Sequence, residues 1–202
     1  MDTSNTSLII PTYNSRDLLI ESIASIRRQV DEDVEVIVVD NGSKDGTDAY
    51  CRKEQLTLIT LPWSSSLAAA GNAGLRLASG DNILLMMPGV LVSRRWLKEM
   101  LHSLYKWRDA GVVRPAHIEA IKQTPVIASV PREKQVHQAC MLFRRELLGH
   151  VGYLQKSPVY EDNVFDDYAD RADQVGYRNM TTGKVTLNHA RHTEPLPHIR
   201  SE

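Results

Sequence analysis

The first half of this chain alternates short apolar runs with segments of helical periodicity, and this order constrains the fold more than any other feature. The apolar runs lie at 7–10, 34–39, 56–61 and 83–87. Between the first two runs, Leu19, Ile23 and Ile26 recur at the spacing of one helical face, and the Ala-rich segment 66–78 also predicts a helix. Strands that alternate with helices predict an α/β fold, with a mostly parallel central sheet and helices on both faces.

The second half has a weaker pattern but still favours a single domain over 1–202. We expect a helix over 93–107, a strand over 135–143, a short helix over 144–151, an acidic helix over 161–175 and a last strand over 185–188. The first of these helices has an apolar stripe and a basic face. That face is either a solvated surface or one that meets a lipid-linked or other anionic acceptor, and both interpretations remain open.

The composition is that of a globular protein. Of its 202 residues, 42% are hydrophobic, and the formal net charge is -1, so we expect no nucleic-acid partner. No apolar stretch reaches the roughly 18 residues that suggest a membrane span, and the polar segment 1–7 lacks the core of a signal peptide. Cys51 and Cys140 have no metal-binding spacing and are expected to be reduced. We therefore expect a cytoplasmic protein that meets a membrane only peripherally, at its inner face.

Polar and turn-forming residues follow the first two predicted strands, where parallel sheets bind their ligands. Tyr13 can stack on a base, and Thr12 can hydrogen-bond to it. Asp40 can accept hydrogen bonds from a base N–H or a ribose hydroxyl, and Gly42 lets the backbone approach a ligand closely. Taken singly, Asn14 is as well explained as a helix cap and the loop after Asp40 as a turn. Their joint order and spacing favour a nucleotide site.

Two motifs at these positions closely resemble the opening of the family 2 glycosyltransferases. The stretch 8–14 reads Leu-Ile-Ile-Pro-Thr-Tyr-Asn, and 36–47 reads Val-Ile-Val-Val-Asp-Asn-Gly-Ser-Lys-Asp-Gly-Thr. The resemblance continues through 70–81, and looser matches at 139–146 and 151–153 extend it over most of the chain. It implies the GT-A fold and transfer of a sugar from a nucleotide donor.

The resemblance also implies partners and site residues. The donor would be a nucleotide diphosphate sugar, most usually a UDP-sugar, bound by the half 1–92, and the acceptor a glycan, lipid or protein bound by the half 93–202. Matched residue by residue, the donor positions are Tyr13 and Asp40 at the base, Pro11, Thr12 and Asn14 around it, and Asn72 nearby. We expect a role in surface glycan biosynthesis, with a partner chain or a homodimer completing the acceptor site.

The chain departs from the family at its metal position. The family usually ends its fourth strand with Asp-x-Asp or Asn-Pro-Asp, whose last aspartate binds a divalent cation, whereas 87–89 here is Met-Pro-Gly. Because Gly89 has no side-chain oxygen, any Mg2+ or Mn2+ is expected to bind weakly. Three hypotheses remain open: cationic side chains replace the metal, Asp81 or His189 supplies a displaced metal site, or the protein has lost catalysis and keeps a binding or scaffolding role.

The family's general base also has more than one match. Asp162 is the first candidate and Glu161 the second, and either would deprotonate the acceptor hydroxyl as it attacks the anomeric carbon. About three extra residues separate this pair from Arg171, so an alignment anchored on Arg171 selects Asp166 and Asp167 instead. Asp167 and Arg171 also have the i,i+4 spacing of a structural ion pair on a helix.

Overall fold

The computed structural model describes residues 5–29, 34–120, 140–156 and 164–189. Its strands are β1 (Thr6–Thr12), β2 (Glu35–Asp40), β3 (Thr57–Thr60), β4 (Asn82–Met86), β5 (Val90–Leu91), β6 (Ala110–Ala120), β7 (Cys140–Arg144) and β8 (Arg178–His189). Its helices are α1 (Arg16–Gln29), α2 (Thr47–Lys53), α3 (Leu67–Leu77), α4 (Trp96–Lys106), α5 (Leu147–Val151) and α6 (Val164–Gln174). The predicted alternation over the first half is confirmed by β1 to β4 and the three helices between them.

The strands form one sheet in the order β3-β2-β1-β4-β7-β6-β8-β5. The four strands of the first half pair in parallel, so their carboxyl ends lie along one edge of the sheet. Strand β7 then joins β4 in the antiparallel direction. The register of β1 and β2 pairs Thr12 with Asp40, which brings the two predicted donor loops side by side.

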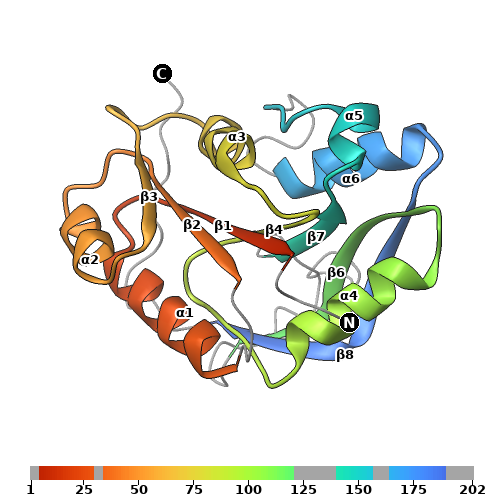
Figure 1. Cartoon of the computed structure of the whole chain (residues 1–202), viewed down its shortest axis with the longest axis horizontal. Helices are drawn as coiled ribbons and strands as arrows, with labels where there is room; N and C mark the ends of the chain where they lie inside the picture. The colour runs from red at the N-terminus through yellow and green to blue at the C-terminus, as the bar shows by residue number, and fades with distance from the viewer. Residues whose placement is uncertain (1–4, 30–33, 121–139, 157–163, 190–202) are drawn as a thin grey trace, which may run out of the picture.

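Helices cover both faces of the sheet, as the sequence predicts (Figure 1). Because successive strand residues point to opposite faces, Leu8 and Ile10 contribute to one core while Ile9 contributes to the other. The first core lies against α1 and α4, and the second lies against α3, α5 and α6. These apolar runs are buried on both sides, which is why they read as continuous hydrophobic segments.

Two strands of the second half differ from the sequence prediction. Strand β6 was not predicted, because Gly111 and Pro115 interrupt its apolar pattern. In the folded chain a Cβ on Gly111 would lie 2.9 Å from the Cβ of Tyr177, and Pro115 borders a register shift between β6 and β8. The last strand extends over Arg178–His189 rather than 185–188, because its polar first half pairs with β6. The expected strand over 135–143 is described only from residue 140.

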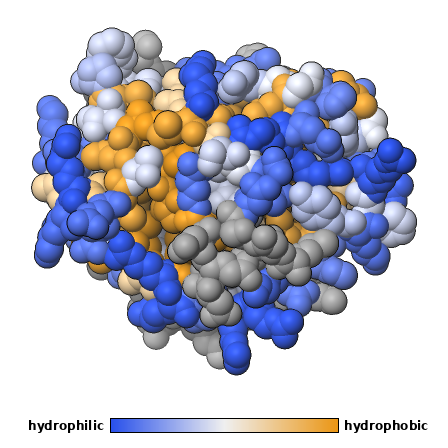
Figure 2. All heavy atoms as spheres, in the orientation of Figure 1, coloured by the Kyte–Doolittle hydropathy of each residue, from blue (hydrophilic) through white to orange (hydrophobic). Residues whose placement is uncertain are grey.

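In the same orientation, the surface has an apolar part and a hydrophilic part (Figure 2). Its apolar area gathers on the left, where β2 and β3 lie, and the right half is mostly hydrophilic. Strand β3 is the edge of the sheet, and Leu56 and Leu58 there are only partly buried. Within the described residues, no helix has the length and apolar character needed to cross a membrane.

Candidate functional site

The carboxyl ends of β1 and β2 bring two buried polar side chains together. Asp40 is 1% exposed, and its Oδ1 accepts the N–H of Ser43 at 3.0 Å, the one hydrogen bond that the described residues give this carboxylate. Thr12 is 3% exposed, and its Oγ1 has no hydrogen-bond partner in the described part of the chain. Pro11 is buried beside them, and Tyr13 is partly buried. Because buried polar groups are normally satisfied, this spare hydrogen-bonding capacity indicates a place for a polar ligand.

The loop after β2 is held by the segment that follows β1. The N–H of Asn14 donates to Ser43 Oγ at 2.9 Å, and the N–H of Lys44 donates to Asn14 Oδ1 at 2.8 Å. Asn14 has a φ of 46°, in the left-handed region that asparagine tolerates better than most residues. Asn14 therefore ties the two donor loops to each other, which is a structural role beside its predicted place in the donor pocket.

Asp45 caps α1 from across the site. One of its carboxylate oxygens accepts the N–H of Arg16, the first residue of α1, at 2.8 Å. Burial alone would raise the pKa of Asp45, but hydrogen bonds from Thr47 and from the Arg16 amide outweigh it and lower the pKa below its ordinary value. The carboxylate therefore stays charged at neutral pH, where it complements the positive end of the helix dipole.

The chain approaches Gly42 closely from the loop after β3. Gly42 has a φ of 85°, and a Cβ there would lie 3.1 Å from the carbonyl carbon of Trp63. Buried Asn41 fixes this second loop, because its side-chain amide makes three hydrogen bonds to Ser65. Trp63 is 71% exposed at the rim of the site. The sequence prediction missed it, although a tryptophan between proline and three serines is a recognisable signal for an exposed ring.

The loop after β4, which the resemblance aligns with the family's metal position, and the residue after β5 are fixed to α1 by two serines. Gly89 has a φ of 91°, and its N–H donates to Ser22 Oγ at 2.8 Å. Ser25 Oγ accepts the N–H of Val92 at 2.8 Å and donates to the carbonyl of the same residue at 3.3 Å. The loop therefore has a defined conformation that does not include a side-chain oxygen at position 89.

The two predicted substitutes for the metal ligand have different positions. Asp81 precedes the first residue of β4, at the opposite end of that strand from Gly89, so the hypothesis that it supplies a displaced metal site is wrong. His189 is the last residue of β8, and its backbone pairs with Val90, next to Gly89. No group of three or more His, Cys, Asp or Glu residues gathers in a metal-binding arrangement within the described residues. Among the described residues, the side chains thus do not form the metal centre that the resemblance implies.

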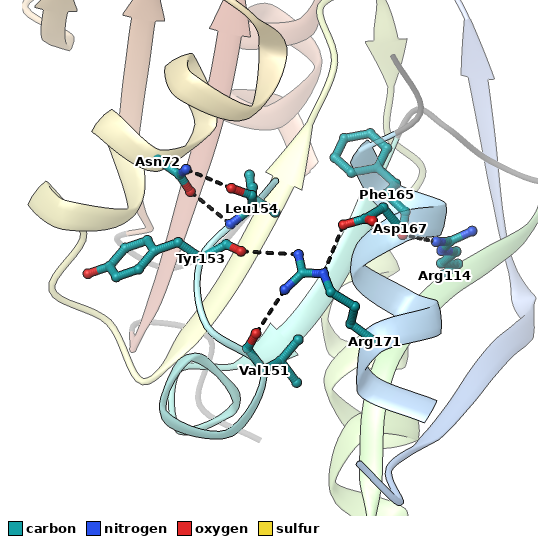
Figure 3. Close-up of polar contacts among 8 residues, drawn as sticks. All are labelled: Asn72, Arg114, Val151, Tyr153, Leu154, Phe165, Asp167 and Arg171. Carbon is teal, nitrogen blue, oxygen red and sulfur yellow. Dashed lines mark hydrogen bonds and ion pairs between the residues drawn. The ribbon is translucent and has the colours of Figure 1, made fainter. Parts of the chain in front are cut away.

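The acidic helix α6 begins just after the candidate base segment. Glu161 and Asp162 lie outside the described residues. Asp166 forms an ion pair with Arg114, whose guanidinium also donates to the carbonyl of Phe165. Asp167 accepts from Arg171 Nε at 2.9 Å, so the predicted i,i+4 ion pair is confirmed (Figure 3).

A polar latch joins α3, α6 and the segment after α5 (Figure 3). Asn72 Nδ2 donates to the Leu154 carbonyl at 2.9 Å, and Asn72 Oδ1 accepts the N–H of Leu154 at 2.9 Å. From the other side, Arg171 donates to the carbonyls of Val151 at 2.8 Å and Tyr153 at 3.1 Å.

A glycine in α3 makes the close packing of this latch possible. A Cβ at Gly71 would lie 2.5 Å from Leu154 Cδ1, so glycine makes room for the leucine side chain. Asn72 thus holds the Leu154 backbone, a role the sequence analysis did not predict, and its contact with a donor stays a prediction.

The chain matches a protein family over most of its length. The model described as Glycosyl transferase family 2 matches residues 7–135, more than half of the 202 residues. The uncharacterized glycosyltransferase YfnE of Bacillus subtilis is 37% identical over 93 residues, which cover 44% of this chain and 24% of the relative. Glycosyltransferase GlyG of Streptococcus pneumoniae is 27% identical over 53% of this chain and 37% of its own. The chain therefore spans less than two fifths of these two relatives.

Solved structures test the predicted fold. The mannosyltransferase PcManGT from Pyrobaculum calidifontis, in complex with GDP-Man and Mn2+, superposes with a TM-score of 0.75 at 26% identity, over 94% of this chain and 57% of its own. S. aureus TarS 1–349 in complex with UDP-GlcNAc has a TM-score of 0.71 at 20% identity, over 94% of this chain and 59% of its own. The expected GT-A fold is confirmed by these neighbours.

Proposed function

The chain belongs to glycosyl transferase family 2, and on that premise we propose that it binds a nucleotide diphosphate sugar and transfers the sugar to an acceptor. The observation that carries the proposal is the buried pair at the ends of β1 and β2. Within the described residues, the Asp40 carboxylate accepts a single hydrogen bond and Thr12 Oγ1 has none. A base or ribose that donates to Asp40 and bonds Thr12 would use the capacity that the fold leaves unused.

The remaining donor contacts follow from the two loops. Tyr13 stacks on the base, Pro11 and Asn14 shape the pocket around it, and Gly42 admits the ribose and diphosphate close to the backbone. We propose a UDP-sugar as donor, since TarS has been solved with UDP-GlcNAc and uridine is the usual base of the family. The complex of PcManGT with GDP-Man makes a guanosine donor the first alternative to test.

We propose Asp162 as the general base, with Glu161 as the second candidate. The base takes the proton of the acceptor hydroxyl as that oxygen bonds to the anomeric carbon and the nucleoside diphosphate leaves. The ion pairs of the competing carboxylates support this choice, because Asp166 and Asp167 already bind Arg114 and Arg171. A carboxylate whose lone pairs are bound to arginine is a poor proton acceptor.

The same site supports a reaction without a tightly held metal. Gly89 offers no ligand, so a Mg2+ or Mn2+ ion would depend on the diphosphate and water and would bind weakly. The backbone pairing of His189 with Val90 supports a role for His189 beside the diphosphate or such an ion. The second candidate function, a catalytically inactive GT-A protein that binds the donor as a scaffold, rests on the same substitution at Gly89.

The acceptor is proposed to be a glycan, a lipid-linked sugar or a protein in surface glycan assembly. One relative supports it, the low-salt glycan biosynthesis hexosyltransferase Agl10 of Haloferax volcanii. A partner chain or a second copy would complete the acceptor site.

A thermal-shift titration tests donor binding. Saturating UDP should stabilise the protein by about 2.7 kcal/mol at 100 times its Kd. Asp40→Asn keeps an oxygen for the Ser43 amide but removes the charge, and should abolish the shift. Asp48→Asn is the matched control, because Asp48 is an exposed carboxylate on α2. If no nucleoside diphosphate stabilises the protein, neither the enzyme nor the inactive donor-binding protein is correct.

Turnover separates those two functions. In an assay of UDP release from a UDP-sugar in the presence of acceptor extracts, Asp162→Asn should lower the rate by about 10² to 10⁴ while the UDP thermal shift is kept. Asp166→Asn is the comparison. A larger loss from Asp166→Asn would place the base on α6, and binding without turnover for any donor would favour the scaffold.

A further inference from the structure

A surface of mixed cationic and aromatic character lies at the carboxyl end of α4. We call it the α4 surface and define it by five exposed residues: Tyr105, Lys106, Trp107, Arg108 and Arg178. The opposite side of the helix is apolar, and its residues Leu97, Met100, Leu101 and Leu104 are buried in the first core. The packing of the apolar side fixes which residues the helix presents to solvent.

Two large aromatic rings are exposed on this surface. Trp107 is 44% exposed, and the cationic groups of Lys106 and Arg178 lie 5.4 and 5.3 Å from its ring centroid. Tyr105 is 45% exposed, with the Arg144 guanidinium 5.9 Å from its centroid. These distances are those of cation–π contacts. Both rings are therefore held at the surface among positive charges instead of being turned into the core.

The charge of the α4 surface is opposite in sign to that of the whole chain. Three of its five residues are cationic, while the formal net charge of the chain is -1. The neighbouring acid Asp109 is paired with Arg178 at 3.0 Å, which leaves the charges of Lys106 and Arg108. A local concentration of arginine and lysine with tryptophan and tyrosine is the composition that meets lipid headgroups, where aromatic rings and cations both find favourable contacts.

We propose that the α4 surface docks this protein on an anionic membrane. Since the apolar side of α4 is buried in the core, the helix adsorbs at the headgroups and does not enter the acyl chains. Trp107 is the aromatic anchor, and the cations on either side of it bind lipid phosphates. A single-stranded nucleic acid would also suit aromatic and basic residues, but a sequence pI of about 6.7 is far below the strongly basic balance of nucleic-acid-binding domains.

Docking at the carboxyl end of α4 leaves the proposed donor site clear. Tyr105 donates its hydroxyl proton to Asn82 Oδ1 at 2.8 Å, and Asn82 is the first residue of β4. The aromatic end of α4 therefore lies at the opposite end of β4 from Gly89. Membrane binding does not depend on sugar transfer, so a failure of one leaves the other intact.

Vesicle co-sedimentation tests the proposal. The protein should bind phosphatidylcholine vesicles that contain phosphatidylglycerol, bind pure phosphatidylcholine weakly, and dissociate as salt is added. Each basic residue near an anionic surface strengthens binding about fivefold, so Lys106→Gln with Arg108→Gln should lower the partition coefficient about 25-fold. The matched control is Arg52→Gln with Lys53→Gln, an exposed basic pair on α2. Melting curves of both double variants exclude unfolding as the cause.

Tryptophan fluorescence gives a second readout. In a Trp63→Phe background, Trp96 is 1% exposed and Trp107 is the exposed ring, so anionic vesicles should shift the emission to the blue. The proposal is overturned by equal binding to neutral vesicles, by equal losses in the two double variants, or by vesicle binding without an emission shift. Binding of a fluorescent oligonucleotide that is lost in Lys106→Gln with Arg108→Gln, without vesicle binding, would assign the surface to nucleic acid instead.

Discussion

Replacing Asn72 by alanine would test the latch between α3 and the segment after α5. The substitution removes two hydrogen bonds to the Leu154 backbone. At about 1 kcal/mol for each bond, we expect a loss of about 2 kcal/mol in the free energy of unfolding. For a chain of this size, about 2 to 4 °C of melting temperature corresponds to 1 kcal/mol, so the melting temperature should fall by about 4 to 8 °C.

Nucleotide affinity separates the structural role of Asn72 from its predicted contact with the donor. Isothermal titration with UDP should give a Kd for Asn72→Ala within about twofold of the parent, because the amide is bound to Leu154, whereas losing a donor hydrogen bond would cost about tenfold. Leu77→Ala, at an exposed position on the same helix, is the control. An unchanged melting temperature with a large loss of UDP affinity would refute our reasoning and make Asn72 a donor ligand.

Three further predictions concern the metal position, acid stability and the thiols. Gly89→Asp should lower the free energy of unfolding by about 1 to 2 kcal/mol, because the φ of 91° at this position disfavours a side chain, and it should make UDP binding more sensitive to Mn2+. Calorimetry with and without chelator measures the UDP affinity, and strong metal dependence in the parent protein would contradict the prediction. Burial alone would raise the pKa of Glu35, but hydrogen bonds from Ser7 and Ser79 lower it below 4.5, so the ionised carboxylate stabilises the fold above that pH and this effect is lost as pH falls through the folded pKa. The urea midpoint of Glu35→Gln should therefore depend less on pH in that range than the midpoint of the parent, and parallel curves for the two proteins would contradict this prediction. Burial raises the pKa of Cys51 to about 11 and of Cys140 to about 12, so both thiols should resist a thiol-reactive dye until urea unfolds the protein; rapid labelling of the folded protein would show that it opens locally.

The first half of the fold could be predicted because its strands are buried on both faces. Runs such as Ile37 to Val39 are apolar without interruption, and the turn residues after them mark the strand ends. Strand β6 could not be predicted, since Gly111 and Pro115 look like breaks until the closeness of Tyr177 and the register shift explain them. The acidic residues of α6 needed the structure too, because only the fold brings Arg114 to Asp166.

In the loops after β1 and β2, too, some features could be predicted from the sequence and others could not. The strand pattern placed Thr12 and Asp40 at the carboxyl ends of the first two strands, and the register of the sheet shows that these ends are neighbours. Their neighbours were beyond prediction, because Asn41 reaches Ser65 and Asn72 reaches Leu154 only through contacts between segments distant in sequence. The sequence predicts that position 89 has lost a metal ligand. The hydrogen bond from the Gly89 amide to Ser22 could not be predicted, because it depends on how α1 packs against this loop.

The serine contacts of α1 have a consequence for how the site is spaced. Asp45 accepts the N–H of the first residue of this helix. Ser22 accepts the N–H of Gly89 after β4, and Ser25 accepts the N–H of Val92 after β5. At 1.5 Å per residue, the Ser22 and Ser25 positions lie about 9 and 14 Å along the axis from Arg16. The length of α1 thus sets the distance between the loop after β2 and the loop after β4. Hydroxyl groups of α1 hold the segments after β4 and β5, so the spacing between these segments and the loop after β2 follows from the length of the helix.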